Sequence, residues 1–118
     1  MALASAAIQP TDLLFSPLVA EKVITTSNNF SGTFPQYTTR DTGKWLWFSP
    51  NTWTSGFFPA TLYIMNTRKQ LCPKSTASYD YVTKGREWSL PLVPIETHNT
   101  VEHDVGFISY PFQEELVV

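Results

Sequence analysis

The sequence predicts an all-α fold, and three observations lead to this expectation. Apolar residues recur at helical spacing in several segments, strands and helices do not alternate, and no run of hairpin signals occurs. With 118 residues, the chain is long enough for one small domain. Hydrophobic residues make up 42% and charged residues 15%, a balance typical of a packed domain rather than a disordered segment or a long solvated helix.

The N-terminal half is predicted to hold a helix, a loop and an extended segment. The helix covers residues 17–27, because Ser16 is a good capping residue and proline suits the first helical position. Residues 30–43 are expected to form a loop, since glycine and proline recur in them. Residues 44–48 are expected to be extended, because Pro50 disfavours helix just before it.

Three further helices are predicted along the rest of the chain. The second helix begins near residue 53 and continues through residue 65, with Pro59 close enough to its start to be tolerated. The third covers residues 75–90 with an interruption at Gly85, and two prolines then impose a loop. The last helical segment is expected over residues 105–112.

Charge and hydropathy argue against two classes of partner. The net charge is −2, whereas a nucleic-acid-binding domain normally has a basic face. No apolar stretch approaches the roughly 20 residues that a membrane helix needs. The apolar start, residues 1–8, has no basic residue before it and is too short for a signal peptide, so we expect a cytoplasmic protein whose residues 1–15 are flexible. These features leave the oligomeric state open.

No metal or other cofactor is expected. His98 and His103 are five residues apart, and neither zinc-type ligand spacing nor a phosphate loop or dinucleotide fingerprint occurs. Cys72 is the single cysteine, so it forms no internal disulfide, which favours a reducing compartment. A nucleophilic pair of Cys72 and His103 stays open, although no motif supports it.

The first candidate binding motif is segment 53–59, with the sequence WTSGFFP. A tryptophan near a helix start can present its flat face to the C–H side of a sugar ring, and its indole N–H can donate to a carboxylate or hydroxyl. The alternative is that Trp53, Phe57 and Phe58 pack in a core between helices.

The second candidate motif is segment 103–107, HDVGF, which places an imidazole beside a carboxylate. If burial raises its pKa, Asp104 can act as a general acid or base. The alternative is that Asp104 caps the last helix, in which case backbone N–H groups keep it ionised. Gly106 is expected to let the backbone come close to a neighbour. Glycosidic chemistry usually needs a second carboxylate, and the spacing of the other acidic residues nominates none.

Together the two segments resemble the N-terminal part of glycoside hydrolase family 88, the unsaturated glucuronyl hydrolases. Segment 53–59, followed by Leu62 and Tyr63, and segment 103–107 occur in the order of that family and at about its spacing. The resemblance covers about residues 45–116, and Ala60 stands where the family commonly has glycine. Segment 103–107 favours this family over the related unsaturated rhamnogalacturonyl hydrolases of family 105.

The resemblance implies an (α/α)6 toroid of six helical hairpins. It also implies an enzyme that removes a 4,5-unsaturated uronic acid from the non-reducing end of oligosaccharides left by polysaccharide lyases. In such enzymes an aspartic acid protonates the vinyl ether and activates the water that adds. Asp104 then matches one of two essential aspartates, His103 a neighbouring active-site histidine, and Trp53 a tryptophan that packs near the substrate. The proton-donating aspartate is implied to lie beyond Val118.

A complete toroid of twelve helices needs at least about 200 residues. Residues 1–118 are therefore expected to form a single incomplete domain that holds only the first helices of the toroid and is inactive alone. The rival hypothesis is a self-contained α-helical module that binds a carbohydrate or a protein without catalysis. The sequence does not specify which acidic polysaccharide supplies the substrate.

Overall fold

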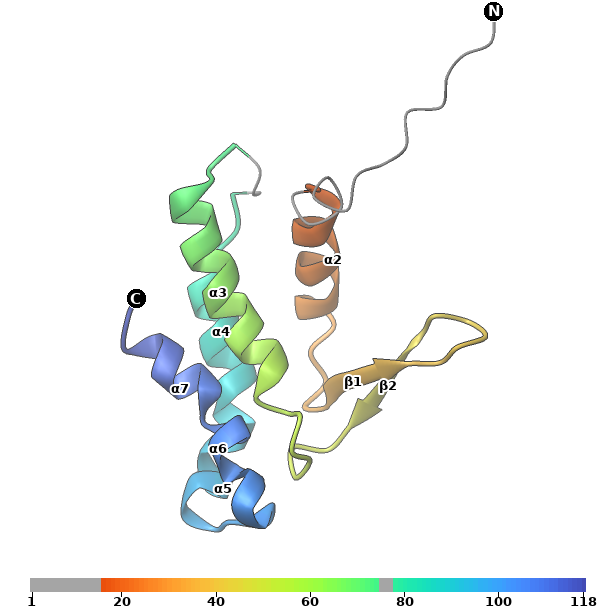
Figure 1. Ribbon diagram of the computed structural model, residues 1–118, viewed down its shortest axis with the longest axis vertical. Helices are drawn as coiled ribbons and strands as arrows, with labels where there is room; N and C mark the ends of the chain where they lie inside the picture. The colour runs from red at the N-terminus through yellow and green to blue at the C-terminus, as the bar shows by residue number, and fades with distance from the viewer. Residues whose placement is uncertain (1–15, 75–77) are drawn as a thin grey trace, which may run out of the picture.

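The structure is a computed structural model that describes residues 16–74 and 78–118. Residues 1–15, expected to be flexible, and the first residues of the predicted third helix lie outside the described residues. The fold is mostly helical with one small sheet (Figure 1). Its elements are, in chain order, α2 (Leu18–Ser27), β1 (Phe34–Thr38), β2 (Trp45–Phe48), α3 (Phe57–Leu71), α4 (Tyr81–Ser89), a 3-10 helix (Leu90–Leu92), α5 (Val93–Thr97), a second 3-10 helix (Glu102–Asp104), α6 (Val105–Ile108) and α7 (Tyr110–Glu115).

The longest helix, α3, packs against both α4 and α7. Helix α2 stands to one side of these helices, and the hairpin of β1 and β2 projects away from them (Figure 1). The short helices α5 and α6 gather at the end of the molecule where α3 begins (Figure 1). None of the described helices is long and apolar enough to cross a membrane.

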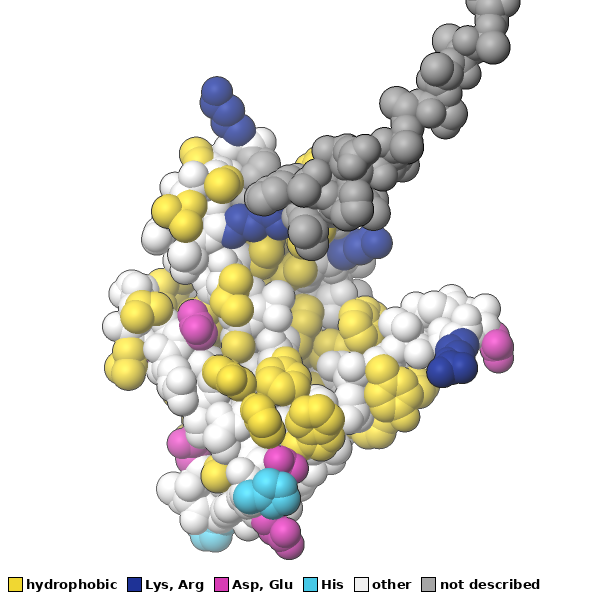
Figure 2. All heavy atoms as spheres, viewed as in Figure 1, with side chains coloured by type: hydrophobic (Ala, Val, Ile, Leu, Met, Phe, Trp, Pro, Cys, Tyr) yellow, Lys and Arg dark blue, Asp and Glu magenta, His cyan; other side chains and the backbone are white. Residues whose placement is uncertain are grey.

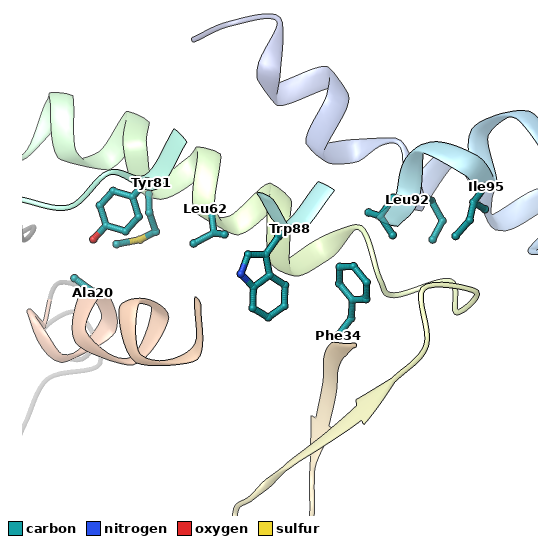
Figure 3. Packing of buried hydrophobic residues seen from close by; sticks show 9 residues of the cluster. Ala20, Phe34, Leu62, Tyr81, Trp88, Leu92 and Ile95 are labelled. Carbon is teal, nitrogen blue, oxygen red and sulfur yellow. The ribbon is translucent and has the colours of Figure 1, made fainter. Parts of the chain in front are cut away.

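The hydrophobic core centres on Trp88, which α4 holds fully buried. Its ring centroid lies 4.8 Å from that of Phe30, 5.7 Å from Phe34 and 4.5 Å from Phe58. Its Nε1 donates a hydrogen bond of 3.0 Å to the carbonyl oxygen of Ser27 at the end of α2. Figure 3 shows Phe34 reaching from the hairpin toward this ring. Trp88 therefore joins α2, β1, α3 and α4 in a single core.

Helix α4 begins at an aspartate cap and contains a buried glycine. The Asp80 carboxylate accepts a hydrogen bond of 3.0 Å from the backbone N–H of Thr83, which lowers the pKa of Asp80. The predicted interruption at Gly85 is wrong, because Gly85 lies inside α4 against Tyr63 of α3. A Cβ at this position would come within 2.8 Å of the Tyr63 ring. The glycine thus lets two helices approach closely instead of breaking one.

Tyr63 should produce an alkaline transition in stability. Burial raises its pKa to about 12, and the neighbouring Glu115 carboxylate adds to the rise. Because an unfolded tyrosine titrates near pH 10, the stabilisation is complete below about pH 10 and is lost as the pH rises to about 12. We expect this group to remove up to about 2 kcal/mol of unfolding free energy over that interval.

Urea denaturation at successive pH values tests this expectation. Tyr63→Phe should flatten the profile above about pH 10, whatever its stability at neutral pH, because phenylalanine has no proton to lose. If the variant and the original chain lose stability in parallel, Tyr63 is not the responsible group.

The helix starts were predicted with unequal success. The first helix is confirmed, and the Oγ atom of Ser16 accepts a hydrogen bond of 3.2 Å from the first helical backbone N–H. Helix α3 begins at Phe57 rather than near Trp53, because residues 51–56 form turns. The last predicted segment is helical as expected, although it is divided into α6 and α7.

The prediction of a loop after the third helix is wrong. Pro91 lies in the first turn of the 3-10 helix, and Pro94 lies in the first turn of α5. The missing proline N–H costs no hydrogen bond in a first helical turn. The two prolines therefore start short helices instead of preventing them.

The all-α expectation needs correction as well. Residues 44–48 are extended as predicted, but residues 30–43, expected to form a loop, contain β1, which pairs antiparallel with β2. Pro35 is tolerated because β1 is an edge strand, and Gly43, at φ 64°, helps to close the hairpin. The burial of Phe34 against Trp88 anchors the strand. A mostly helical chain is thus confirmed, while the toroid stays a proposal.

Candidate functional site

The structure brings segments 53–59 and 103–107 into backbone contact. Gly56 lies at the N-cap of α3 and abuts the backbone of Phe107 and Ile108 in α6. A Cβ at Gly56 would lie 2.1 Å from the carbonyl oxygen of Phe107, so this approach requires glycine. Gly106, which was expected to allow a close approach, has no atom within 4 Å of such a Cβ. That expectation is wrong, and the role belongs to Gly56.

Hydrogen bonds hold the turn before α3 and join it to the loop before α6. The buried Oγ of Ser55 donates to the carbonyl oxygen of Ser49 at 3.2 Å and stabilises the turn. The Oγ1 of Thr100 donates to the Oδ1 of Asn51 at 2.8 Å and links the two loops. The two segments are therefore fixed by side chains as well as by the Gly56 contact.

The loop before α6 contains a strained residue. Glu102 adopts a φ of 54°, in the left-handed region that non-glycine residues seldom occupy. Asn99 supports this conformation, because its side chain donates to the carbonyl oxygen of Glu102 at 2.7 Å and accepts from the backbone N–H of Val101 at 3.0 Å. The loop that delivers His103 and Asp104 thus has a defined shape.

Four partly exposed rings meet where the two segments touch, and we call Trp53, Phe57, Phe107 and Tyr110 the aromatic cluster. Neighbouring ring centroids in it lie between 5.7 and 6.2 Å apart, mostly edge to face. The rings are 38–47% exposed, and Figure 2 shows hydrophobic side chains gathered on this part of the surface. The core alternative therefore holds for Phe58, which packs on the central tryptophan, and not for Trp53.

The His103 and Asp104 side chains lie close together at the surface. The Nε2 of His103 is 3.4 Å from the Oδ1 of Asp104, and the two side chains are 87% and 30% exposed. Asp104 occupies the N-cap position of α6, but its side chain accepts no capping hydrogen bond. The carboxylate therefore has neither the capping bonds nor the full burial that the two sequence-based alternatives require.

Sequence reasoning missed one member of the aromatic cluster and misjudged another. Tyr110 was not singled out, and Phe57 was paired with Phe58 as a possible core residue. The usable signal was the spacing of Phe107 and Tyr110, because residues three apart lie on the same side of the helix predicted over residues 105–112. In the structure the two residues belong to α6 and α7.

The alternative nucleophilic pair of Cys72 and His103 finds no support in the structure. Cys72 directly follows α3, at the end of that helix far from α6, so it does not meet His103 (Figure 1). Within residues 16–74 and 78–118, no group of three or more histidine, cysteine, aspartate or glutamate side chains could hold a metal ion.

Comparison with known proteins finds no relative of this chain. No family model matches the sequence, and neither curated proteins nor solved structures give a match.

Proposed function

We propose that this chain carries part of the substrate site of a glycoside hydrolase that acts on 4,5-unsaturated uronides, as its resemblance to family 88 implies. The observation that supports this proposal most is the contact of Gly56 with Phe107. The two segments on which the resemblance rests are fifty residues apart in the sequence, yet they meet at one surface. The same contact assembles the aromatic cluster beside α6, the helix whose N-cap position is Asp104.

Each side chain at this surface has a role in the proposed site. Trp53 stacks on the apolar face of the sugar ring, since its ring is 47% exposed and its position is fixed by Phe57 and Phe107. The imidazole of His103, which is 87% exposed, can donate a hydrogen bond to the uronate carboxylate. Asp104 positions the water that adds to the double bond.

The reaction also needs a proton donor. One proton and the hydroxyl group of one water add across the vinyl ether, and the resulting hemiketal opens to release the sugar. The resemblance assigns the proton to an aspartate outside these 118 residues. The chain by itself is therefore proposed to bind and orient the unsaturated uronide without turning it over.

Binding of an unsaturated uronic-acid disaccharide, followed by isothermal titration calorimetry, tests the proposal. Trp53→Ala should weaken binding about tenfold, which corresponds to about 1.4 kcal/mol of lost stacking. Trp45→Ala is the matched control, because Trp45 is similarly exposed but lies on the hairpin. Equal losses for both variants, or no loss for Trp53→Ala, would overturn the assignment.

The exposure of the aromatic cluster also favours a second candidate, a carbohydrate-binding module without catalysis. The same titration with the saturated disaccharide separates the two functions. A site built around vinyl-ether hydration should prefer the unsaturated sugar, and Asp104→Asn should reduce that preference. Equal affinity for both sugars, unchanged in Asp104→Asn, would support the binding module instead.

A further inference from the structure

The outer edge of β2 is open. Within the described residues, the backbone of Trp45–Phe48 forms hydrogen bonds with β1 alone. The opposite edge of the sheet, on β1, contains Pro35, which lacks a donor, and a register irregularity after it. Strand β2 has neither a proline nor a charged side chain. Of the two edges, β2 is therefore the one able to accept another strand.

Both faces of β2 are apolar at this edge. Trp45 and Trp47 point toward the helical side, where Trp47 lies 6.3 Å from Trp88. Trp45 lines a groove of about 690 Å³ between α2, α3 and the hairpin. Leu46 lies opposite Tyr37 on the other face. Three successive side chains, Trp45, Leu46 and Trp47, are 44%, 36% and 37% exposed, so the strand leaves much apolar surface uncovered.

We propose that β2 pairs antiparallel with β2 of a second copy of this chain to form a four-stranded sheet. Residues directly opposite each other in an antiparallel pair lie on the same face, so the twofold axis must pass at one residue of the strand. With the axis at Leu46, each Trp45 lies opposite Trp47 of the second copy. This register forms two cross-strand tryptophan pairs on one face and a leucine pair on the other.

Stability and charge both suit this register. A two-stranded hairpin is marginal in water, whereas a sheet of three or more strands with an apolar face is stable. Lys44, the nearest charged residue, faces Phe48 of the second copy, and the two Lys44 side chains begin about 14 Å apart. No like charges meet directly, so identical strands can pair without electrostatic conflict. The inference does not depend on the proposed enzymatic function.

Light scattering coupled to size-exclusion chromatography tests the dimer. The original chain should elute, as its concentration rises, with twice its monomer mass of 13.4 kDa. Leu46→Lys should remain monomeric, because it places two lysines directly opposite each other. Leu71→Lys is the matched control and should still dimerise, since Leu71 is 76% exposed at the end of α3. Circular dichroism establishes that the variants are folded.

Oxidative crosslinking then tests the register. In a Cys72→Ser background, Leu46→Cys should give a crosslinked dimer on a non-reducing gel, whereas Leu71→Cys should not. A monomer at every concentration, a dimer that survives Leu46→Lys, or equal crosslinking at the two positions would overturn the proposal. Large aggregates that Leu46→Lys leaves unchanged would overturn it too.

Discussion

Replacing Trp88 by alanine is expected to lower the free energy of unfolding by about 4 kcal/mol. Trp88 is fully buried and contacts Phe30 after α2, Phe34 of β1 and Phe58 of α3, so its removal leaves a cavity where several elements meet. It also leaves the Ser27 carbonyl oxygen without its indole donor. A loss of this size is a large fraction of the roughly 5–15 kcal/mol that stabilises a typical domain. Guanidinium denaturation followed by circular dichroism measures it.

Two companion variants make this result interpretable. Trp53→Ala removes the same side chain from an exposed position and should cost less than about 1 kcal/mol. Trp88→Phe keeps an aromatic ring in the core but loses part of the packing and the hydrogen bond, so its loss of stability should fall between those of the two alanine variants. If Trp53→Ala and Trp88→Ala lose equal stability, the core is not centred where the structure places it.

Gly56→Ala should destabilise the chain by about 3 kcal/mol and disrupt the candidate site. The added Cβ would lie 2.1 Å from the Phe107 carbonyl oxygen and 2.9 Å from the Ile108 backbone, so α6 must move away. Because the same contact assembles the aromatic cluster, uronide binding should weaken together with stability. Thermal unfolding and the calorimetric titration measure the two effects.

Gly106→Ala is the matched control, since it makes the same change on the other segment. Space surrounds this position and its φ is not left-handed, so alanine should be neutral or should stabilise α6 by about 0.5–1 kcal/mol. Equal destabilisation by the two substitutions would show that the segments are not in contact through Gly56.

Most helices were predictable because their signals are local. Ser16 and Pro17 indicate the start of α2, and Cys72 and Pro73 indicate the end of α3. Each of these boundaries can be recognised from a few neighbouring residues. Pro91 and Pro94 were misinterpreted because a proline is tolerated in the first turn of a helix but disrupts the helix when it lies in the interior. Where a helix begins relative to the proline depends on the packing of neighbouring elements, and the local sequence does not contain that information.

The hairpin was half predictable for a related reason. Pro50 correctly indicated the extended β2, but β1 contains a proline and lies between Gly32 and Gly43, a pattern typical of loops. What makes residues 34–38 a strand is the burial of Phe34 against Trp88, more than fifty residues away. Contacts of such long range override local propensity.

The candidate site shows the same limit. The sequence singled out Trp53, His103 and Asp104 as site residues, and the structure places them in the two segments that meet; their roles stay proposals. It assigned the close approach to Gly106 instead of Gly56, since the space around a glycine is set by its tertiary partner. A glycine in a motif can be assigned to a close backbone approach only when the segment that it contacts is known.

The contact between Gly56 and Phe107 also has a cost in chain entropy. Closing a loop of about fifty residues costs roughly 3.5 kcal/mol of chain entropy, and the contact of Phe34 with Trp88 closes a loop of similar length. During synthesis Trp53 emerges from the ribosome well before α6, so it can meet Phe107 only after both segments have been made. The aromatic cluster therefore forms only after Phe107 has been synthesised and has reached Trp53.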